Sequence, residues 1–224
     1  MDDPGPIVSQ ALGARPGSAE IRLLSRLAQE LDSRLEKHQV REVLAALREE
    51  LLDGAPPSLE ELHRKVRSCR RCPTLEGPPM LPRWNLVNPS VLLVTESSQL
   101  SDERVEGLAK ALERAGLDKK KVAITGVTRC HGQAGAEEAE RCSPFLDAEI
   151  AALRPQLVLA MGTLPARTIL GTEVRVADAR GRLFFAGATA LMVTWSPGYA
   201  FRGGRPQEEY FEDLSAVGRF LNGS

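Results

Sequence analysis

Residues 129–171 decide the fold class, and they read RCHGQAGAEEAERCSPFLDAEIAALRPQLVLAMGTLPARTILG. The apolar spacing within FLDAEIAAL is typical of an amphipathic helix. Ser143 is a suitable N-cap for this helix, and Pro144 suits the first helical position, where a missing N–H loses no partner. Arg154 and Pro155 end it, because proline cannot continue the hydrogen-bonded turn. We therefore expect a helix that begins at Pro144.

A short apolar run follows the helix. Leu157–Met161 is predicted to be a strand, because an uninterrupted apolar run is typical of a parallel strand that is buried on both faces. Gly162 and Thr163 turn into a second helix over residues 164–170, which ends at Gly171. A helix, a buried strand and a second helix in succession predict a layered α/β domain.

Similar patterns elsewhere predict the remaining elements. Ser58 and Glu61 match a capping box, in which the two side chains satisfy free amides at the start of a helix over residues 59–68. The other predicted elements are helices over residues 101–116 and 206–221, strands over 90–95 and 122–127, and, after Glu173, a strand, a turn at 179–181, a hairpin and a last strand over 190–195.

The N-terminal quarter differs from the rest in composition. Residues 1–17 are rich in Pro and Gly and are predicted to be a flexible tail. Residues 18–57 are predicted to form a helical extension and linker, with leucines at helical spacing through residues 18–53. This apolar stripe either packs on the protein's own core or docks a protein partner or a second copy of the chain. Residues 58–224 then form one α/β domain.

Length and composition set further bounds. The chain has 224 residues, of which 42% are hydrophobic, and this is enough for one domain with a real core. It has no apolar run of about 18 residues, so no membrane span is expected. Its acidic start, MDDP, does not resemble a signal peptide. We therefore expect a cytoplasmic protein whose thiols stay reduced.

Four cysteines give the strongest chemical signal in the sequence. Cys69 and Cys72 form the motif CRRC, and Cys130 and Cys142 lie in the opening stretch. Where thiols stay reduced, clustered cysteines favour a metal site over disulfides. Thiolates are soft ligands that suit either an iron–sulfur cluster or zinc. The remaining alternative is that the cysteines are unrelated structural residues.

The net charge of −1 hides an acidic N-terminal part and a basic remainder. The basic residues gather around the cysteines, and they are Arg64, Lys65, Arg67, Arg70, Arg71, Arg129 and Arg141. Such a run is either a solvated face or, as a rim around a metal site, a surface that binds phosphate. His63 lies in the same segment without ligand-like neighbours in sequence and is predicted to be a surface residue.

Several motifs now combine into a family resemblance. CRRC, a strand that runs into Cys130, the run from Cys142 to Gly162, the turn at Arg180 and the segment TWSPGYAFR resemble the iron–sulfur uracil-DNA glycosylases of bacteria and archaea. The resemblance covers about residues 58–221. It implies a three-layer α/β/α fold with a central, mostly parallel sheet, and DNA as the partner. It also implies a [4Fe–4S] cluster held by Cys69, Cys72, Cys130 and Cys142.

The chain departs from that family at its site motifs. Where the family has G-E-x-P-G, this chain keeps Glu96, followed by two serines, and the family's P-F-V-G loop is missing. Gly126 stands where the family has an asparagine that reads the edge of uracil. Ser196 stands where the family has a histidine that stabilises the departing base. The arginine beyond it is kept as Arg202.

These departures have a chemical meaning. Excision of a base requires flipping it into a pocket, reading its edge and stabilising the departing anion. Gly126 has no group that reads an edge, and the Ser196 hydroxyl is a weaker donor than an imidazole. We therefore expect a DNA-binding protein of repair or replication whose glycosylase activity is lost or strongly altered. The candidate DNA contacts are Arg70, Arg71 and Arg202.

Two alternatives remain open at this point. If Glu96 activates water while Tyr199 or His131 enters the base pocket, the chain is an active glycosylase for uracil or another damaged base. The second alternative is a structural protein that holds an iron–sulfur cluster or zinc.

Overall fold

The computed structural model describes residues 58–72, 79–84, 86–98, 100–130, 135–171, 173–186 and 189–222. The predicted tail, extension and linker in residues 1–57 lie outside these ranges, as does His131. Among the helices described, none is both long and apolar enough to cross a bilayer.

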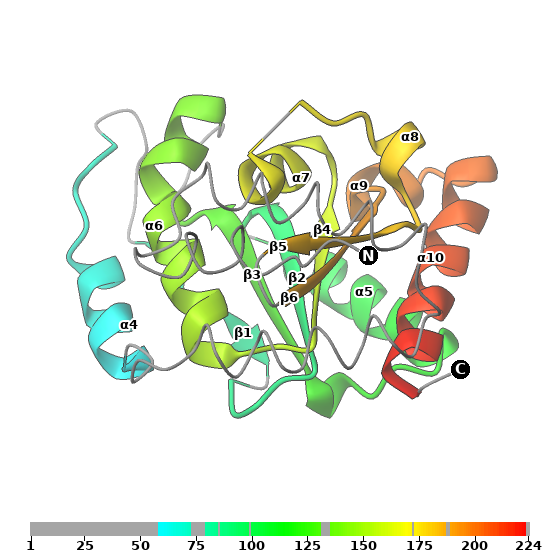
Figure 1. Ribbon diagram of the computed structural model, residues 1–224, viewed down its shortest axis with the longest axis horizontal. Helices are drawn as coiled ribbons and strands as arrows, with labels where there is room; N and C mark the ends of the chain where they lie inside the picture. Colours follow the sequence, from blue (N-terminus) through cyan, green and yellow to red (C-terminus); the bar gives the residue numbers. More distant parts are fainter. Residues whose placement is uncertain are drawn as a thin grey trace, which may run out of the picture.

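A six-stranded sheet forms the centre of the structure (Figure 1). In spatial order its strands are β1 (Arg83–Trp84), β3 (Val122–Thr128), β2 (Val91–Ser97), β4 (Leu157–Met161), β6 (Thr189–Thr194) and β5 (Leu183–Ala186). β3, β2, β4 and β6 run parallel, and the edge strands β1 and β5 are antiparallel. The predicted mostly parallel sheet is confirmed, and the carboxyl ends of its four central strands lie along one edge.

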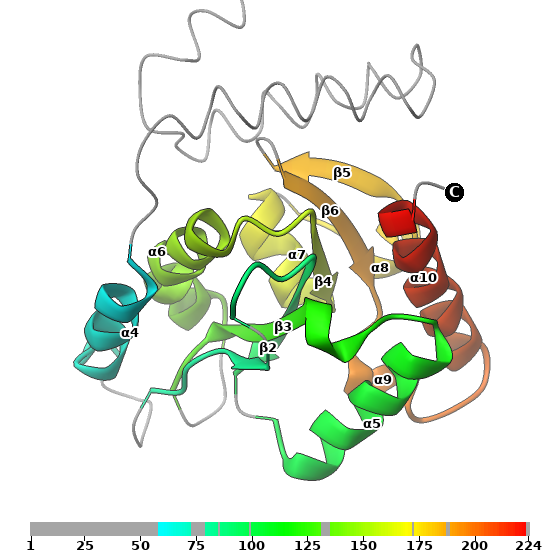
Figure 2. The same cartoon turned by 90° about the horizontal axis from the view of Figure 1, so that it is seen from below.

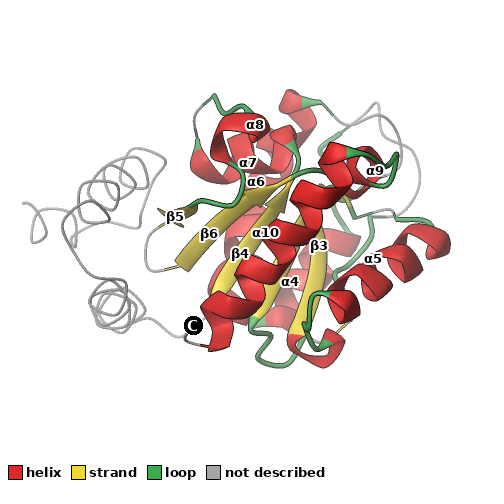
Figure 3. Cartoon of the chain, turned by 90° about the vertical axis from the view of Figure 1, so that its right-hand side faces the viewer, coloured by secondary structure: helices red, strands yellow, loops and turns green. Residues whose placement is uncertain are grey.

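Helices cover both faces of the sheet (Figures 2 and 3). One face carries α5 (Asp102–Arg114), α9 (Pro197–Ala200) and α10 (Arg205–Asn222), and the other carries α6 (Ala136–Leu153), α7 (Thr163–Leu170) and α8 (Val176–Ala179). α4 (Leu59–Arg67) packs on the outside of α6, and the short 3₁₀ helix η1 (Lys119–Lys121) leads into β3. The predicted three-layer α/β/α fold is confirmed.

Alternation along the strands builds the two cores. Leu93 and Leu159 belong to the core shared with α5 and α10, whereas Leu92 and Val158 belong to the core shared with α6 and α7. Successive side chains of a strand point to opposite faces, so a strand covered on both sides must be apolar throughout. The apolar runs of the sequence therefore predicted these strands correctly.

Helix α6 begins earlier than its proline suggests. The prediction that it starts at Pro144 is wrong, because the helix runs from Ala136 with Gly135 as its N-cap. A proline inside a helix leaves the carbonyl four residues earlier without its usual donor. Here the Ser143 hydroxyl donates to that carbonyl, the oxygen of Glu140, at 2.9 Å. The serine therefore compensates for the proline, and Cys142 lies inside the helix.

The segment after α7 also differs from the prediction. The strand expected from Glu173 does not form: α8 occupies Val176–Ala179, and Arg180 makes only an isolated bridge to Val193. Val176 and Ala179 are both buried, and a helical turn places residues three apart on the same face. The other predicted helices and strands are confirmed, with small shifts at their ends.

The end of β2 crosses over Gly126 of β3. A Cβ added at Gly126 would lie 2.9 Å from the Ser97 Cα, and closer still to the Ser97 carbonyl carbon and the Ser98 nitrogen. Hydrogen bonds fix the crossing: the Ser98 amide donates to the Thr128 carbonyl at 3.0 Å, and the Thr95 hydroxyl donates to the Ser97 carbonyl at 2.8 Å. No side chain fits at position 126 unless the backbone of β2 moves.

This close approach predicts that Gly126→Ala destabilises the fold. Forcing extra atoms into a packed site typically costs about 1–3 kcal/mol, and here the obstacle is main chain, so we expect the upper end of that range. Urea unfolding of the full chain measures the loss. Gly198→Ala is the matched control, since an added Cβ there meets nothing within 4 Å. An unchanged midpoint for Gly126→Ala would show that the crossing is not as tight as described.

Candidate functional site

Three residues from neighbouring strands meet at the carboxyl edge of the sheet. Glu96 lies near the end of β2, Gly162 directly follows β4, and Ser196 follows β6. A Cβ built at Gly162 would lie 3.2 Å from the Ser196 Cβ and 3.5 Å from Glu96 Oε1. The structure therefore brings the predicted residues Glu96 and Ser196 to the same point.

Gly162 is a site residue that the sequence analysis treated only as a turn. Its φ of 110° is rarely adopted by residues with a side chain, and the space beside it belongs to Ser196 and Glu96. The chain passes from β2 to its neighbour β3 on one side and then crosses back to β4 on the other side of β2. The direction in which strands are added therefore reverses between β2 and β4. In open α/β sheets, ligands bind outside the carboxyl ends at such a reversal. In the sequence, the feature that could have indicated this role was a glycine placed directly after a buried strand.

This part of the site has one proton acceptor and one donor of hydrogen bonds. The exposed Glu96 carboxylate can orient or deprotonate a water, and the half-buried Ser196 hydroxyl can donate to a developing negative charge. The main chain of Glu96 is held by the Thr128 hydroxyl, which donates to its carbonyl at 3.0 Å. Gly126 lies beneath Ser97 and Ser98, so position 126 offers no side chain to a base.

Two more of the predicted residues lie within helix α9 and just after it. The Tyr199 ring is 43% exposed and lies 4.9 Å, centroid to centroid, from the ring of Trp195. Arg202 follows α9; it is exposed, and its guanidinium has no hydrogen bond or ion pair to any residue that the structure describes. Arg202 is therefore available to a ligand outside the protein.

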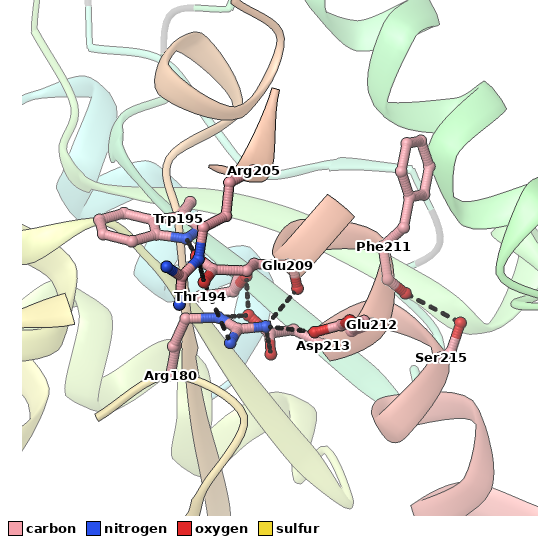
Figure 4. Close-up of polar contacts among 9 residues, drawn as sticks. All are labelled: Arg180, Thr194, Trp195, Arg205, Glu209, Phe211, Glu212, Asp213 and Ser215. Atoms are coloured by element: carbon pink, nitrogen blue, oxygen red, sulfur yellow. Dashed lines mark hydrogen bonds and ion pairs between the residues drawn. The ribbon is translucent and has the colours of Figure 1, made fainter. Parts of the chain in front are cut away.

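A charged network holds the end of β6 against α10 (Figure 4). Arg180 donates to both carboxylate oxygens of Asp213, at 2.9 and 3.1 Å, and the Thr194 hydroxyl donates to the same carboxylate at 2.7 Å. The Trp195 indole donates to Glu209 at 2.8 Å. These contacts fix the strand that delivers Ser196. The sequence showed Arg180 only as part of a turn, and its partners on α10 are too distant in sequence to be inferred.

The four cysteines lie on three segments: Cys69 and Cys72 follow α4, Cys130 follows β3, and Cys142 lies within α6, which packs against both. All are free thiols, and Cys142 is buried while Cys69, Cys72 and Cys130 are partly exposed. Burial raises the pKa of the Cys130 thiol, and the negative charges of Cys142, Cys72 and Cys69 raise it further. In the described ranges, no three His, Cys, Asp or Glu side chains are grouped so that they could hold a single metal ion.

Two of the basic residues around the cysteines are paired with carboxylates of α6. Arg129 is buried, with 1% of its surface exposed, and pairs with the buried Glu149 at 2.6 Å. Arg141 is more exposed and pairs with Glu137 at 3.2 Å. The interpretation of Arg129 as a surface cation is therefore wrong, because its partner lies one helix further along the chain.

Arg70 and Arg71 are exposed but also support the cysteine loop. Arg70 Nη1 donates to the carbonyl of Cys69 at 2.8 Å and to that of Arg67 at 3.3 Å. The Arg71 guanidinium lies 5.1 Å from the centre of the Phe145 ring, and its Nη1 donates to the Arg141 carbonyl at 3.4 Å. Their remaining N–H groups can still meet phosphate, but replacing either residue also disturbs the loop.

His63 is not the surface residue that the sequence suggested. Its Nε2 atom is buried without a hydrogen-bond partner. Burial lowers the pKa of the imidazole, whereas the nearby Glu149 carboxylate raises it. The side chain is therefore half-buried, with its Nε2 atom turned away from solvent.

The candidate DNA contacts lie at different ends of the molecule. Arg70 and Arg71 follow α4, Arg202 follows α9, and these two helices lie far apart in Figures 1 and 2. A ligand that touches both groups would have to extend across the structure.

Comparisons with known proteins agree with this geometry. A family model described as the uracil DNA glycosylase superfamily matches residues 84–215. A type-4 uracil-DNA glycosylase of Pyrobaculum aerophilum is 26% identical over 193 residues, covering 74% of this chain and 98% of the relative. A type-4 uracil-DNA glycosylase of Archaeoglobus fulgidus is 22% identical over 184 residues, covering 72% of this chain and 92% of the relative. The chain belongs to the uracil-DNA glycosylase superfamily.

Proposed function

We propose that this member of the superfamily binds DNA in repair or replication and has lost, or strongly altered, the excision of uracil. The observation that carries the proposal is the position of Gly126 beneath the backbone of Ser97 and Ser98. A protein tells uracil from cytosine by hydrogen bonds to the Watson–Crick edge of the flipped base. Gly126 has no side chain that could make such a bond, and the crossing main chain of β2 covers it.

DNA binding is supported by the exposed cations on the cysteine side and beyond α9. Arg64, Arg67, Arg70, Arg71 and Arg202 are all exposed. Guanidinium groups bind phosphate through paired hydrogen bonds, and each neutralised phosphate releases counterions. Contacts of this kind position a protein on DNA without reading its sequence.

A glycosylase with a changed substrate is the second candidate. It is favoured by the meeting of Glu96 and Ser196 beside Gly162. In this alternative Glu96 accepts a proton from the attacking water, and Ser196 donates a hydrogen bond to the departing base. Such an enzyme would recognise its base without a side chain at position 126.

The cysteines support a [4Fe–4S] cluster as the cofactor. The four thiols are free and lie on three segments, of which α6 packs against both others, and the family that the sequence resembles uses four cysteines for such a cluster. Cys69, Cys72, Cys130 and Cys142 would hold it. When bound, the cluster supplies a tie between these segments and a centre that can exchange an electron. A zinc site or a purely structural scaffold is the outcome that metal analysis must distinguish.

We expect the full chain, purified without oxygen, to be brown and to contain about four irons per chain. Elemental analysis together with assay of acid-labile sulfide measures this. Cys142→Ser should lower both values, because it removes one ligand without adding volume. Colourless protein with one zinc per chain would contradict the cluster.

DNA affinity should fall steeply with salt, by about 0.9 in the logarithmic slope for each phosphate contact to duplex DNA. Replacing Arg67 and Arg202 by Gln removes two exposed charges and should reduce the slope by roughly one unit per lost contact. Arg219→Gln, at an exposed position in the last turns of α10, is the control and should change little. The readout is fluorescence anisotropy of labelled oligonucleotides over a salt series. Absence of binding at low salt refutes the proposal.

The wild-type protein should not release uracil from a uracil-containing oligonucleotide. The loss of a single donor to the departing anion typically costs about 100- to 1,000-fold in rate, and the unread base adds to this. Alkali treatment converts any abasic site into a strand break that gel electrophoresis detects. Strong cleavage by the wild type that disappears in Glu96→Gln would establish the second candidate instead.

A further inference from the structure

Two aromatic rings lie side by side next to Ser196. The rings of Trp195 and Tyr199 are 4.9 Å apart, centroid to centroid, with an angle of 45° between their planes. Trp195 directly follows β6, and Tyr199 lies in α9. The Tyr199 amide donates to the Ser196 carbonyl at 3.0 Å, so the tyrosine lies one turn beyond the serine. The aromatic pair therefore flanks Ser196 along the chain.

Trp195 is the fixed member of this pair (Figure 4). Its indole N–H donates to the Glu209 carboxylate at 2.8 Å. The same carboxylate accepts a hydrogen bond from Arg205 Nε at 2.8 Å, so the acceptor is itself held in place. The Trp195 ring also packs against the hydrophobic cores on both faces of the sheet. Tyr199 therefore rests on a ring that the fold keeps in position.

The Tyr199 side chain remains open to solvent. It is 43% exposed, although the Trp195 ring covers part of it. A Cβ built at Gly198, directly before Tyr199, meets nothing within 4 Å, so the surface next to the tyrosine is open as well. Unpaired bases stack on aromatic side chains that are presented in this way. Tyr199 is therefore a candidate stacking surface with a rigid support behind it.

Phe201, in the same turn, has a different role. It is 37% exposed, but its ring lies edge-on to the Tyr210 ring with the centroids 5.8 Å apart. It also lies over Gly107 of α5, where an added Cβ would be 3.2 Å from Phe201 Cε2. Phe201 therefore joins α9 to α5 and α10, and it provides a matched control for Tyr199.

A cation follows the exposed tyrosine by one turn. The Arg202 amide donates to the Tyr199 carbonyl at 3.3 Å, which continues the turn beyond α9. Residues three apart in a helical turn are neighbours, with their Cβ atoms about 5–6 Å apart. The Arg202 guanidinium is exposed and has no hydrogen bond or ion pair to the residues that the structure describes. An aromatic ring and a guanidinium at this spacing suit the base and the phosphate of one nucleotide.

We propose that this surface binds single-stranded DNA, with one unpaired base stacked on Tyr199 and a neighbouring phosphate on Arg202. The inference rests on the proposed DNA binding and specifies the form of DNA that is bound. In a duplex, each base is stacked between its neighbours, so a base must first be unstacked before it can reach Tyr199. An unpaired base reaches Tyr199 without that cost. Because Tyr199 is held against Trp195, its ring is placed to receive such a base.

This mode of binding agrees with the crossing at Gly126. Stacking tolerates any sequence, because every base has a π-face. Reading a base requires hydrogen bonds to its edge, and the main chain above Gly126 leaves no side chain there to make them. A protein that stacks bases without reading them binds single strands of any sequence.

The test compares a labelled single strand with the same strand paired to its complement, using the full chain and fluorescence anisotropy at one salt concentration. The wild type should bind the single strand more tightly. Tyr199→Ala should weaken single-strand binding by about 5- to 150-fold, the usual effect of losing one stacked base, and should affect the duplex much less. Tyr199→Phe should keep the single-strand affinity. Tyr199→Leu should lose it, because leucine has bulk but no π-face.

Two controls separate stacking from charge and from packing. Phe201→Leu should leave the single-strand affinity unchanged, because that ring packs against the protein itself. In a salt series on the single strand, Tyr199→Ala should keep the wild-type slope, since it removes no phosphate contact. Arg202→Gln should reduce the logarithmic slope by about 0.7, the value for one phosphate contact on a single strand. A merely structural Tyr199 predicts a lower unfolding midpoint in Tyr199→Ala and an unchanged preference for the single strand.

Equal affinity of the wild type for the two DNA forms would overturn the inference, as would wild-type single-strand affinity in Tyr199→Ala. If Tyr199→Ala does not fold, the comparison of Tyr199→Phe with Tyr199→Leu decides, and equal affinities in these two variants refute stacking. A wild type that binds neither form at low salt contradicts the proposed DNA binding together with this inference. Binding to duplex DNA that is indifferent to position 199, with no preference for the single strand, contradicts the inference alone.

Discussion

The crossing of β2 over Gly126 is the constraint on which the rest of the carboxyl edge depends. Main-chain atoms of Ser97 and Ser98 occupy the space that a side chain at position 126 would need. The same crossing is fixed by bonds from Thr95 and Thr128, and the Thr128 hydroxyl holds the main chain of Glu96. This one contact therefore leaves no room on β3 for a side chain that could contact a base. It also sets the path of β2, the strand that carries Glu96.

β3 connects the two halves of the site. Beyond Gly126 it continues to Arg129, whose buried pairing with Glu149 anchors the strand to α6, and then to Cys130. The same strand therefore links the carboxyl edge of the sheet to the segments that carry the cysteines.

Much of the fold was predictable because the signals are local. The apolar run at Leu157–Met161 and the glycine stop at Gly171 depend only on neighbouring residues, and the structure has both. The start of α6 was mispredicted because Ser143 supplies the donor that Pro144 lacks, and a side chain's hydrogen bond cannot be read from spacing.

The site was predictable only in part, for a related reason. The resemblance identified Glu96, Gly126, Ser196 and the cysteines as residue types at motif positions. The burial of Arg129 depends on Glu149, twenty positions away, and the importance of Gly162 depends on two other strands. From its place in a basic run, Arg129 was interpreted as a surface cation. Only the three-dimensional packing shows that its guanidinium is buried against Glu149.

The most direct measurement of the central claim is the affinity ratio between two oligonucleotides that differ only in one base, uracil or cytosine, measured in one buffer at one salt concentration. A base that is read through its edge changes affinity by about 1–3 kcal/mol. With Gly126 beneath the main chain, the protein should bind both oligonucleotides equally. A preference of tenfold or more for uracil, corresponding to about 1.4 kcal/mol, would show that the protein reads the base and would contradict the account.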